Sequence, residues 1–345
     1  MQLSHHITSD SGHFRELAGQ IADFERAGLD IVWVSEAYGI DAVSRLAYLA
    51  ALTDKLLIGA GILPIYTRTP ALLAQTAAGL DYVSNGRFIL GLGASGPRVI
   101  EGWHGVKYDR PLQRTREIVD VCRRVWRREV LEHHGRAYTM PLPPEQGTGL
   151  GKPLKIIGQP VRARIPIYLA SLTDKSVELA AEIAEGWMPI FFMPEHAKAV
   201  WGDALARGQA KRDPALGPLE IVAGGLVAIG EGLEHLRDLE RRHLALYIGG
   251  MGAPGANFYT DLACRYGFEA EAGHVQDLYL AGKKQEAAAA IPEALLQGTT
   301  LIGPEAYVKE RLAAYKQAGV TILNLTPVGP TDPVRTIERV RSLLA

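Results

Sequence analysis

The stretch LLIGAGILPIYTRTPALLAQTAAGLDYVSNGRFILGLG, residues 56–93, contains a strand, a helix and a second strand. The apolar run Leu56–Ala60 predicts a buried strand, and Pro70–Val83 predicts a helix with proline at its first position. The turn-forming pair Asn85-Gly86 precedes a second strand over Arg87–Leu92. This order predicts two parallel strands joined by a helical crossover.

The same alternation continues on both sides of that unit. Further strands are predicted over 2–7, 31–34, 165–169, 187–190, 220–229 and 321–325, and further helices over 14–27, 112–128, 174–185, 194–211, 305–318 and 333–344. We count eight strand–helix units, which favours a closed barrel over an open sheet. The sequence therefore predicts an α/β fold, a (β/α)8 TIM barrel that spans residues 1–345 as a single domain.

Two segments depart from the repeat, at about 138–164 and 244–303. Long segments of this kind inside a compact domain are often lids or binding loops. We expect residues 244–303 to fold over the barrel, with the glycine-rich stretch 249–252 near a substrate. A subunit interface is the alternative reading of the same segment.

Composition excludes several classes of protein. The chain has 345 residues, of which 47% are apolar and 22% charged, and its net charge is -1. These values exclude disorder and give no electrostatic footprint for nucleic acid or a membrane surface. Two cysteines cannot form a disulfide scaffold, and no metal-ligand spacing stands out. With neither a signal peptide nor a membrane span in the pattern, a soluble cytoplasmic protein is expected.

Function in such barrels lies at the carboxyl ends of the strands. After the second predicted strand, Ser35–Gly39 contains Glu36, which could act in acid–base chemistry or simply cap a helix. After the third strand, Gly59 and Gly61 permit close approach of a flat ligand or form a tight turn, and Tyr66 follows.

Three more stretches follow later strands. The loop Gly91–Pro97 is rich in glycine but lacks the context of a dinucleotide fingerprint, so we reject a Rossmann interpretation. His104, just past this loop, is a site candidate. Residues Ala170–Ser176 open a helix whose first amides could bind phosphate, although Thr173 could be a plain N-cap.

Several of these motifs resemble those of one family, the bacterial-luciferase-like flavin and deazaflavin oxidoreductases. The similarity covers essentially the whole chain, and it is most specific for the branch that depends on coenzyme F420, which includes methylenetetrahydromethanopterin reductase. The segments that carry the resemblance are 81–93, 95–105, 111–117, 180–187 and 246–252.

The resemblance implies a deazaflavin, coenzyme F420, at the carboxyl end of the barrel, with flavin mononucleotide (FMN) as the alternative cofactor. It also implies a cis peptide bond between Gly61 and Ile62 and a phosphate-binding loop over Ala170–Ser176. A homodimer is expected. The cofactor-binding residues implied are Ser35, Glu36, Gly61, Ile62, Gly93, Ala94, Ser95, Ala170, Ser171, Thr173, Asp174, Lys175 and Ser176.

The sequence departs from the sugar-phosphate dehydrogenases of that branch, which carry an Asp-His pair after the second strand and a Glu after the fourth. Here Glu36-Ala37 and Gly96 take those places, which disfavours oxidation of a sugar hydroxyl. Glu36, Tyr66 and His104 are the candidate catalytic residues. The expected activity is hydride transfer between the cofactor C5 and a small organic substrate. An FMN-dependent monooxygenase and a non-catalytic cofactor-binding protein remain alternatives.

Overall fold

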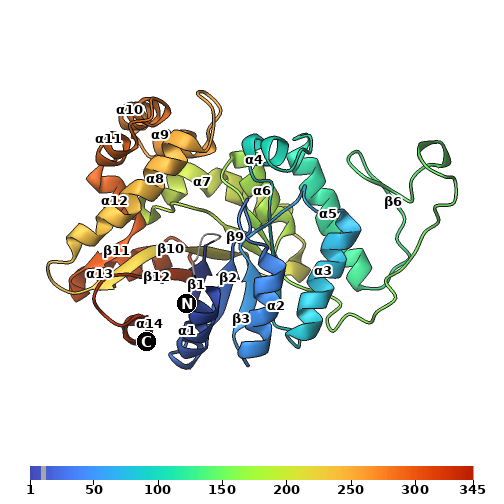
Figure 1. Cartoon of the computed structure of the whole chain (residues 1–345), viewed down its shortest axis with the longest axis horizontal. Coiled ribbons are helices and arrows are strands. Elements are labelled where there is room, and N and C mark those ends of the chain that lie inside the picture. The colour runs from blue at the N-terminus through green and yellow to red at the C-terminus, as the bar shows by residue number, and fades with distance from the viewer. Residues whose placement is uncertain (9–12, 345) are drawn as a thin grey trace.

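Parallel strands form a closed barrel at the centre of the molecule (Figure 1). The structure is a computed structural model that describes residues 1–8 and 13–344. Within these residues eight strands make the barrel, and β10 closes it by pairing with both β9 and β12. In chain order they are β1 (Gln2–Ile7), β2 (Ile31–Val34), β3 (Leu57–Ala60), β5 (Phe88–Gly93), β8 (Ile167–Ala170), β9 (Gly186–Met188), β10 (Glu220–Ile229) and β12 (Ile322–Pro327). The predicted TIM barrel is confirmed.

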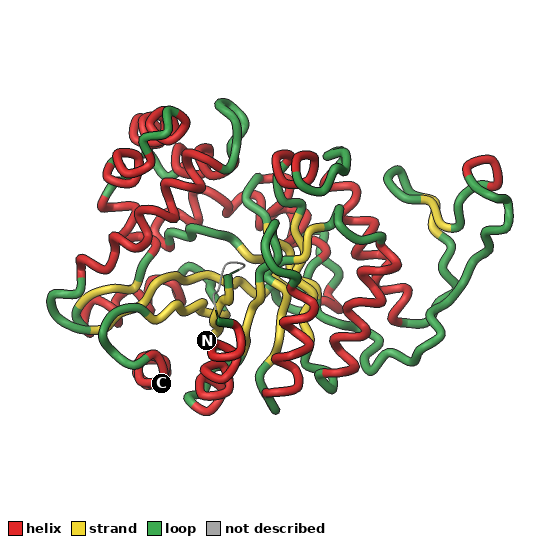
Figure 2. The backbone as a smooth tube through the Cα atoms, in the orientation of Figure 1, coloured by secondary structure: helices red, strands yellow, loops and turns green. Residues whose placement is uncertain are grey.

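Helices surround this barrel (Figure 2). Helix α2 was not among the predicted helices; its N-cap is Asp41, whose carboxylate accepts from the amide of Ser44 at 2.7 Å. The outer helices are α1 (Phe14–Arg26), α2 (Ala42–Leu52), α3 (Pro70–Val83), α4 (Pro97–Gly102), α5 (Pro111–Trp126), α6 (Asp174–Ile183), α7 (Pro194–Gln209), α13 (Glu305–Gln317) and α14 (Pro333–Leu344). Short elements complete the inventory: β4 (Leu63–Pro64), β6 (His133–His134), β7 (Thr139–Met140), β11 (Leu301–Gly303), η1 (Pro144–Gln146), η2 (Pro214–Leu216) and η3 (Glu234–Arg237).

Two large aromatic rings occupy the barrel interior. Trp33 on β2 and Tyr168 on β8 are buried, with ring centroids 5.4 Å apart. Glycines on neighbouring strands leave room for these rings. A Cβ at Gly59 would lie 2.3 Å from Trp33, and one at Gly186 would lie 2.4 Å from Tyr168. The Tyr168 hydroxyl donates to Glu220, and burial raises the pKa of that carboxyl. The rings thus fill the middle of the barrel and leave its carboxyl end to other residues.

The first departing segment begins with the β6–β7 hairpin after α5 and extends away from the barrel (Figure 1). Glu117 on α5 anchors the hairpin by accepting hydrogen bonds from His133 at 3.1 Å and from the amides of Arg136 and Tyr138 at 2.8 and 2.9 Å. Burial alone would raise the pKa of Glu117, but these bonds and one from Gln113 lower it to about 2. One carboxylate therefore fixes where the segment leaves the barrel.

The second departing segment is helical from its start. It contains α8 (Asp238–Gly250), α9 (Phe258–Arg265), α10 (Glu269–Leu280), α11 (Lys284–Ala289) and α12 (Glu293–Thr299), and it ends at β11, which pairs with β10. Arg98 on α4 donates to the carbonyl oxygen of Gly250 at 2.8 Å, which ties the end of α8 to the carboxyl end of the barrel. The predicted location is therefore consistent with this contact, whereas closure as a lid stays a prediction.

Two of the glycines in 249–252 lie in a contact between helices, while the predicted place of this stretch near a substrate stays a prediction. Gly249 and Gly250 belong to the last turn of α8, where a Cβ would lie 2.3 Å and 2.5 Å, respectively, from atoms of Tyr279 on α10. They are small so that two helices can pack closely, rather than to form a flexible loop against a ligand.

No helix within the described residues is long and apolar enough to cross a membrane.

We expect Glu117→Gln to lower the free energy of unfolding at pH 7 by about 1–3 kcal/mol, because buried amides lose a charged acceptor. In the wild-type protein the contribution of Glu117 is complete above its ordinary pKa of 4.5 and is lost as the pH falls through about 2. Urea titrations measure both effects. Glu310→Gln, which changes an exposed carboxylate on α13 in the same way, is the control and should change little. Equal stability of the two variants would contradict the anchoring role.

Gly249→Ala should lower the melting temperature by several degrees, since the new methyl group would overlap Tyr279. Gly273→Ala on α10 is the matched control, because nothing lies within 4 Å of its Cβ position and alanine favours a helix. A loss of stability in both variants, or in neither, would argue against close packing of α8 on α10.

Candidate functional site

Three polar groups meet where β1, β2 and β3 end, at the carboxyl end of the barrel that we call the barrel mouth. The Nε2 atom of His6 lies 2.7 Å from Ser35 Oγ and 3.0 Å from the carbonyl oxygen of Gly61. Ser35 Oγ also donates to that carbonyl oxygen at 3.1 Å. Ser35 and Gly61 were predicted to belong to the site. His6 was missed, because in sequence it is one residue of an ordinary strand.

Burial lowers the pKa of His6 to about 4. The hydrogen bond to Gly61 acts in the opposite direction, while the charges of His5, His243 and Arg45 lower the pKa further. The imidazole is therefore neutral near pH 7.

Gly61 and Ile62 form one wall of the barrel mouth. The peptide bond between them is cis, as the resemblance implied. The Ile62 side chain lies over β5, where a Cβ at Gly93 would be 3.1 Å from two of its carbons. Both Gly61 and Ile62 remain partly exposed. Together with Gly93 they make an apolar wall. Its shape depends on the two glycines, because neither has a side chain.

Glu36 is committed to an ion pair. Its two carboxylate oxygens accept from Arg68 at 2.7 and 2.9 Å, and one of them also accepts from the amide of Ala42 at 3.2 Å. Asp41 accepts from the same guanidinium at 3.2 Å. These contacts join the loops after β2 and β3, so the geometry favours a positioning role for Glu36. Its predicted catalytic role stays a prediction.

Tyr66 packs into the wall of the loop after β3. Its hydroxyl donates to the carbonyl oxygen of Asp109 at 2.9 Å, and its ring lies 5.2 Å from that of Tyr108. Burial raises the pKa of Tyr66, so the phenol keeps its proton. The Tyr108 hydroxyl in turn donates to the carbonyl oxygen of Ser95 at 3.4 Å, which holds the predicted loop Gly93–Ser95.

The loop after β8 leads into α6. Ser171 has a buried hydroxyl oxygen with no hydrogen-bond partner in the described part of the chain. Thr173 is the N-cap, but its hydroxyl pairs with that of Ser176 at 2.9 Å instead of capping the helix. Asp174 in the first turn pairs with Arg265 on α9 at 2.7 Å, and Lys175 is exposed. An unsatisfied hydroxyl beside free helix amides fits an anion such as a phosphate.

His104 follows α4. Its Nε2 atom is buried and finds no partner in the described part of the structure, whereas its backbone amide donates to Val99 at 3.2 Å. The side-chain oxygens of the other two predicted catalytic residues, Glu36 and Tyr66, all have hydrogen-bond partners. Unpaired buried groups are uncommon and call for an explanation such as a bound ligand or water.

An aromatic cluster to which the sequence did not point lies between the end of β9 and the α8–α9 region. Phe191, just past β9, has a positive φ of 52° and contacts His243, Tyr247 and Tyr259 of the α8–α9 region, with centroids 5.2, 5.3 and 6.2 Å away. Its carbonyl oxygen accepts from the Tyr266 hydroxyl at 2.9 Å. No single stretch of sequence carried this signal, because the cluster joins a strand end to two helices some 50 residues later.

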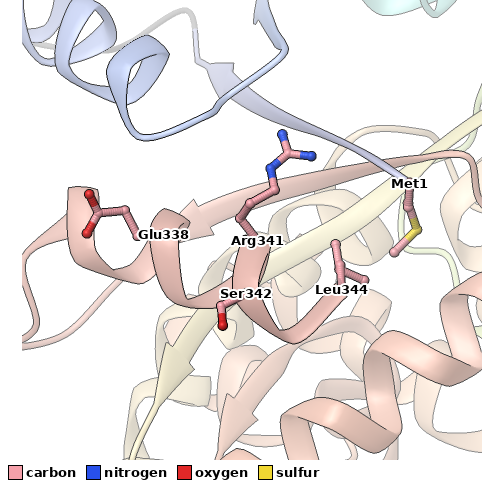
Figure 3. A pocket seen from close by; sticks show the side chains of 5 residues that line it. All are labelled: Met1, Glu338, Arg341, Ser342 and Leu344. Carbon is pink, nitrogen blue, oxygen red and sulfur yellow. The ribbon is translucent and has the colours of Figure 1, made fainter.

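A pocket at the other end of the barrel lies apart from these residues (Figure 3). It is placed by the start of β1 and the end of α14, and its lining residues are Met1, Glu338, Arg341, Ser342 and Leu344. Because the amino end of a TIM barrel serves stability rather than catalysis, we do not place the site there.

The sequence matches the model of the luciferase-like monooxygenase family over residues 1–321. The chain belongs to this family. It is 40% identical over 321 residues to a protein of Mycobacterium tuberculosis named as a coenzyme F420-dependent oxidoreductase, and the match covers 92% of each chain. It is also 25% identical over 335 residues to the 5,10-methylenetetrahydromethanopterin reductase of Archaeoglobus fulgidus, covering 94% of this chain and 93% of that one.

A solved structure supports the same fold. The F420-dependent tetrahydromethanopterin reductase of Methanopyrus kandleri superposes with a TM-score of 0.77 at 22% identity, covering 98% of this chain and 96% of the other. Because its named relatives are oxidoreductases, this luciferase-like chain is an enzyme of the oxidoreductase class.

Acid should destabilise the protein through His6. The pKa of the imidazole is about 4 in the folded protein and near 6.5 when unfolded, so the unfolded chain binds more protons between these values. The stabilising contribution is therefore present above pH 6.5 and is lost as the pH falls toward 4. In urea titrations the free energy of unfolding should fall between pH 7 and pH 5 in both proteins. We expect this fall to be about 1–2 kcal/mol smaller in His6→Gln than in the wild type. Equal losses would show that His6 does not titrate in this way.

Proposed function

We propose that this enzyme depends on coenzyme F420 and transfers a hydride between the C5 atom of that cofactor and a small organic substrate. The observation that carries the proposal is the 40% identity, over 92% of both chains, to a relative named for this cofactor. The geometry of the barrel mouth supports it, since glycines and one isoleucine leave an apolar wall at the carboxyl end of the barrel.

The residues present fit such a cofactor in two places. Gly61, Ile62 and Gly93 offer a wall against which a flat ring can lie. At the start of α6, the buried hydroxyl of Ser171 lacks a partner, and the helix terminus supplies amides for a phosphate. The same proposal assigns Ser35, Ala94, Ala170 and Thr173–Ser176 to the surroundings of the cofactor.

When bound, the deazaflavin supplies a two-electron hydride carrier, and the protein contributes binding, orientation and exclusion of water. The aromatic cluster of Phe191, Tyr247 and Tyr259 would face the substrate and shield the transfer from solvent. Glu36 and Tyr66 hold neighbouring loops through Arg68 and Asp109. His104 is the residue to which we assign proton exchange, because its Nε2 atom has no other use among the described residues.

Titration of the apoprotein with F420 and, separately, with FMN tests the cofactor. We expect fluorescence changes that saturate with F420 at a Kd at least ten-fold below that for FMN. Tighter binding of FMN would contradict the proposal and favour the monooxygenase alternative. Binding of F420 without turnover of any electrophilic acceptor would instead favour a cofactor-binding protein.

Ser171→Ala tests the phosphate site. Removing the hydroxyl should weaken F420 binding about 10- to 100-fold, the effect of one lost hydrogen bond to a charged group. It should leave the melting temperature unchanged or slightly raised, because a buried atom without a partner is removed. Ser342→Ala, at the opposite end of the barrel, is the control and should affect neither quantity. Unchanged F420 affinity in Ser171→Ala would place the phosphate elsewhere.

A further inference from the structure

The carbonyl oxygen of Gly61 receives two hydrogen-bond donors at once. His6 Nε2 lies 3.0 Å from it and Ser35 Oγ lies 3.1 Å from it, while Nε2 and Oγ are 2.7 Å apart. A carbonyl oxygen only accepts, so a bond from His6 requires the proton to be on Nε2. The Ser35 hydroxyl then donates its own proton to the Gly61 carbonyl oxygen, and the single Nε2–H is shared between that oxygen and Ser35 Oγ as a three-centre hydrogen bond. Each of the three contacts is satisfied by this single arrangement of protons.

The glycine makes this arrangement possible. A Cβ at Gly61 would lie 3.1 Å from Trp33 Cβ and 3.3 Å from His6 Nε2, so a side chain here would push the imidazole away. On the other side, the Gly61 amide donates to the carbonyl oxygen of Val34 at 2.8 Å. Donors and acceptors from β1 and β2 therefore hold both polar groups of this residue.

Ile62 is the next residue, and its position follows from that of the Gly61 carbonyl. Its side chain occupies the space next to Gly93 on β5, where a Cβ would otherwise lie. Moving the Gly61 carbonyl would rotate the peptide that carries Ile62 and so displace the apolar wall of the barrel mouth. His6 is joined to this wall through one carbonyl oxygen.

We propose that His6, together with Ser35, is a positioning residue that sets the wall formed by Gly61 and Ile62 by donating to the Gly61 carbonyl oxygen, and that it does not exchange protons with the substrate. The inference rests on the proposed function for the identity of the group that lies against this wall, the F420 ring. The two hydrogen bonds from His6 and Ser35 to the Gly61 carbonyl oxygen, which we call the clamp, are a property of the chain itself.

Measuring F420 affinity in two variants of His6 distinguishes the effect of the hydrogen-bond donor from the effect of side-chain volume. His6→Leu keeps the volume but removes the donor, and it should weaken F420 binding at least ten-fold. His6→Gln places an amide N–H near the position of Nε2 and should restore the affinity to within about three-fold of the wild type. Between pH 6 and pH 8 the affinities of the wild type and His6→Gln should depend on pH in the same way, because no proton is exchanged. Wild-type affinity in His6→Leu, or a pH profile altered in His6→Gln, would overturn the proposal.

Ser35→Ala is the second variant, in case His6→Leu does not fold. It removes one of the two donors and should weaken F420 binding by about three- to ten-fold. Ser4→Ala is the matched control, because Ser4 is also a serine of the barrel interior, but its hydroxyl contacts Leu323 and Asn324 instead of Gly61. Equal effects of the two serine variants would contradict a specific role of the Gly61 carbonyl.

The tautomer of His6 tests the clamp without any cofactor. Long-range ¹H–¹⁵N spectra of histidine-labelled apoprotein, with His6 assigned by its absence in His6→Gln, should show a neutral ring protonated on Nε2. The Nδ1-protonated tautomer would refute the clamp. If the wild type fails to bind F420, the proposed function fails, whereas an Nε2-protonated ring in the same sample would still support the clamp.

Discussion

Trp33 and Tyr168 fill the middle of the barrel, and they can do so only because Gly59 and Gly186 carry no side chains. This packing reaches the carboxyl end of the barrel at Gly61, where an added Cβ would lie 3.1 Å from Trp33 Cβ. At the ends of β1, β2, β3 and β5 stand His6, Ser35, Gly61 and Gly93, which are small or polar residues. Apolar burial thus stabilises the middle of the barrel, while its carboxyl end is left for recognition.

Charges near the barrel mouth are largely neutralised by their neighbours. Arg68 binds Glu36, and Arg265 binds Asp174. Among the buried polar atoms without a partner in the described residues, the Ser171 hydroxyl oxygen and the His104 Nε2 atom belong to predicted site residues, and both groups are uncharged in the neutral protonation state. An environment of this kind orients a ligand through hydrogen bonds and apolar contact, and it suits a cofactor that carries its own reactivity.

The sequence was sufficient for the barrel, because eight short apolar runs could be recognised as strands and helical patterns separate most of them. The cis peptide bond between Gly61 and Ile62 could be predicted only from the resemblance to a known family. Helix α2 was missed, and Gly249 and Gly250 were misinterpreted, because a glycine that accommodates Tyr279 in a helix contact looks the same in sequence as one in a loop. The roles of Glu36 and Tyr66 could not be read either, since their partners Arg68 and Asp109 are 32 and 43 residues away.

A crystal structure of the enzyme with F420 tests the central claim most directly. The account predicts that the deazaflavin ring lies against Ile62 and Gly93 and that the phosphate is within hydrogen-bonding distance of Ser171 Oγ and the first amides of α6. A ring bound away from the Gly61–Ile62 wall, or a phosphate held at another helix, would contradict it.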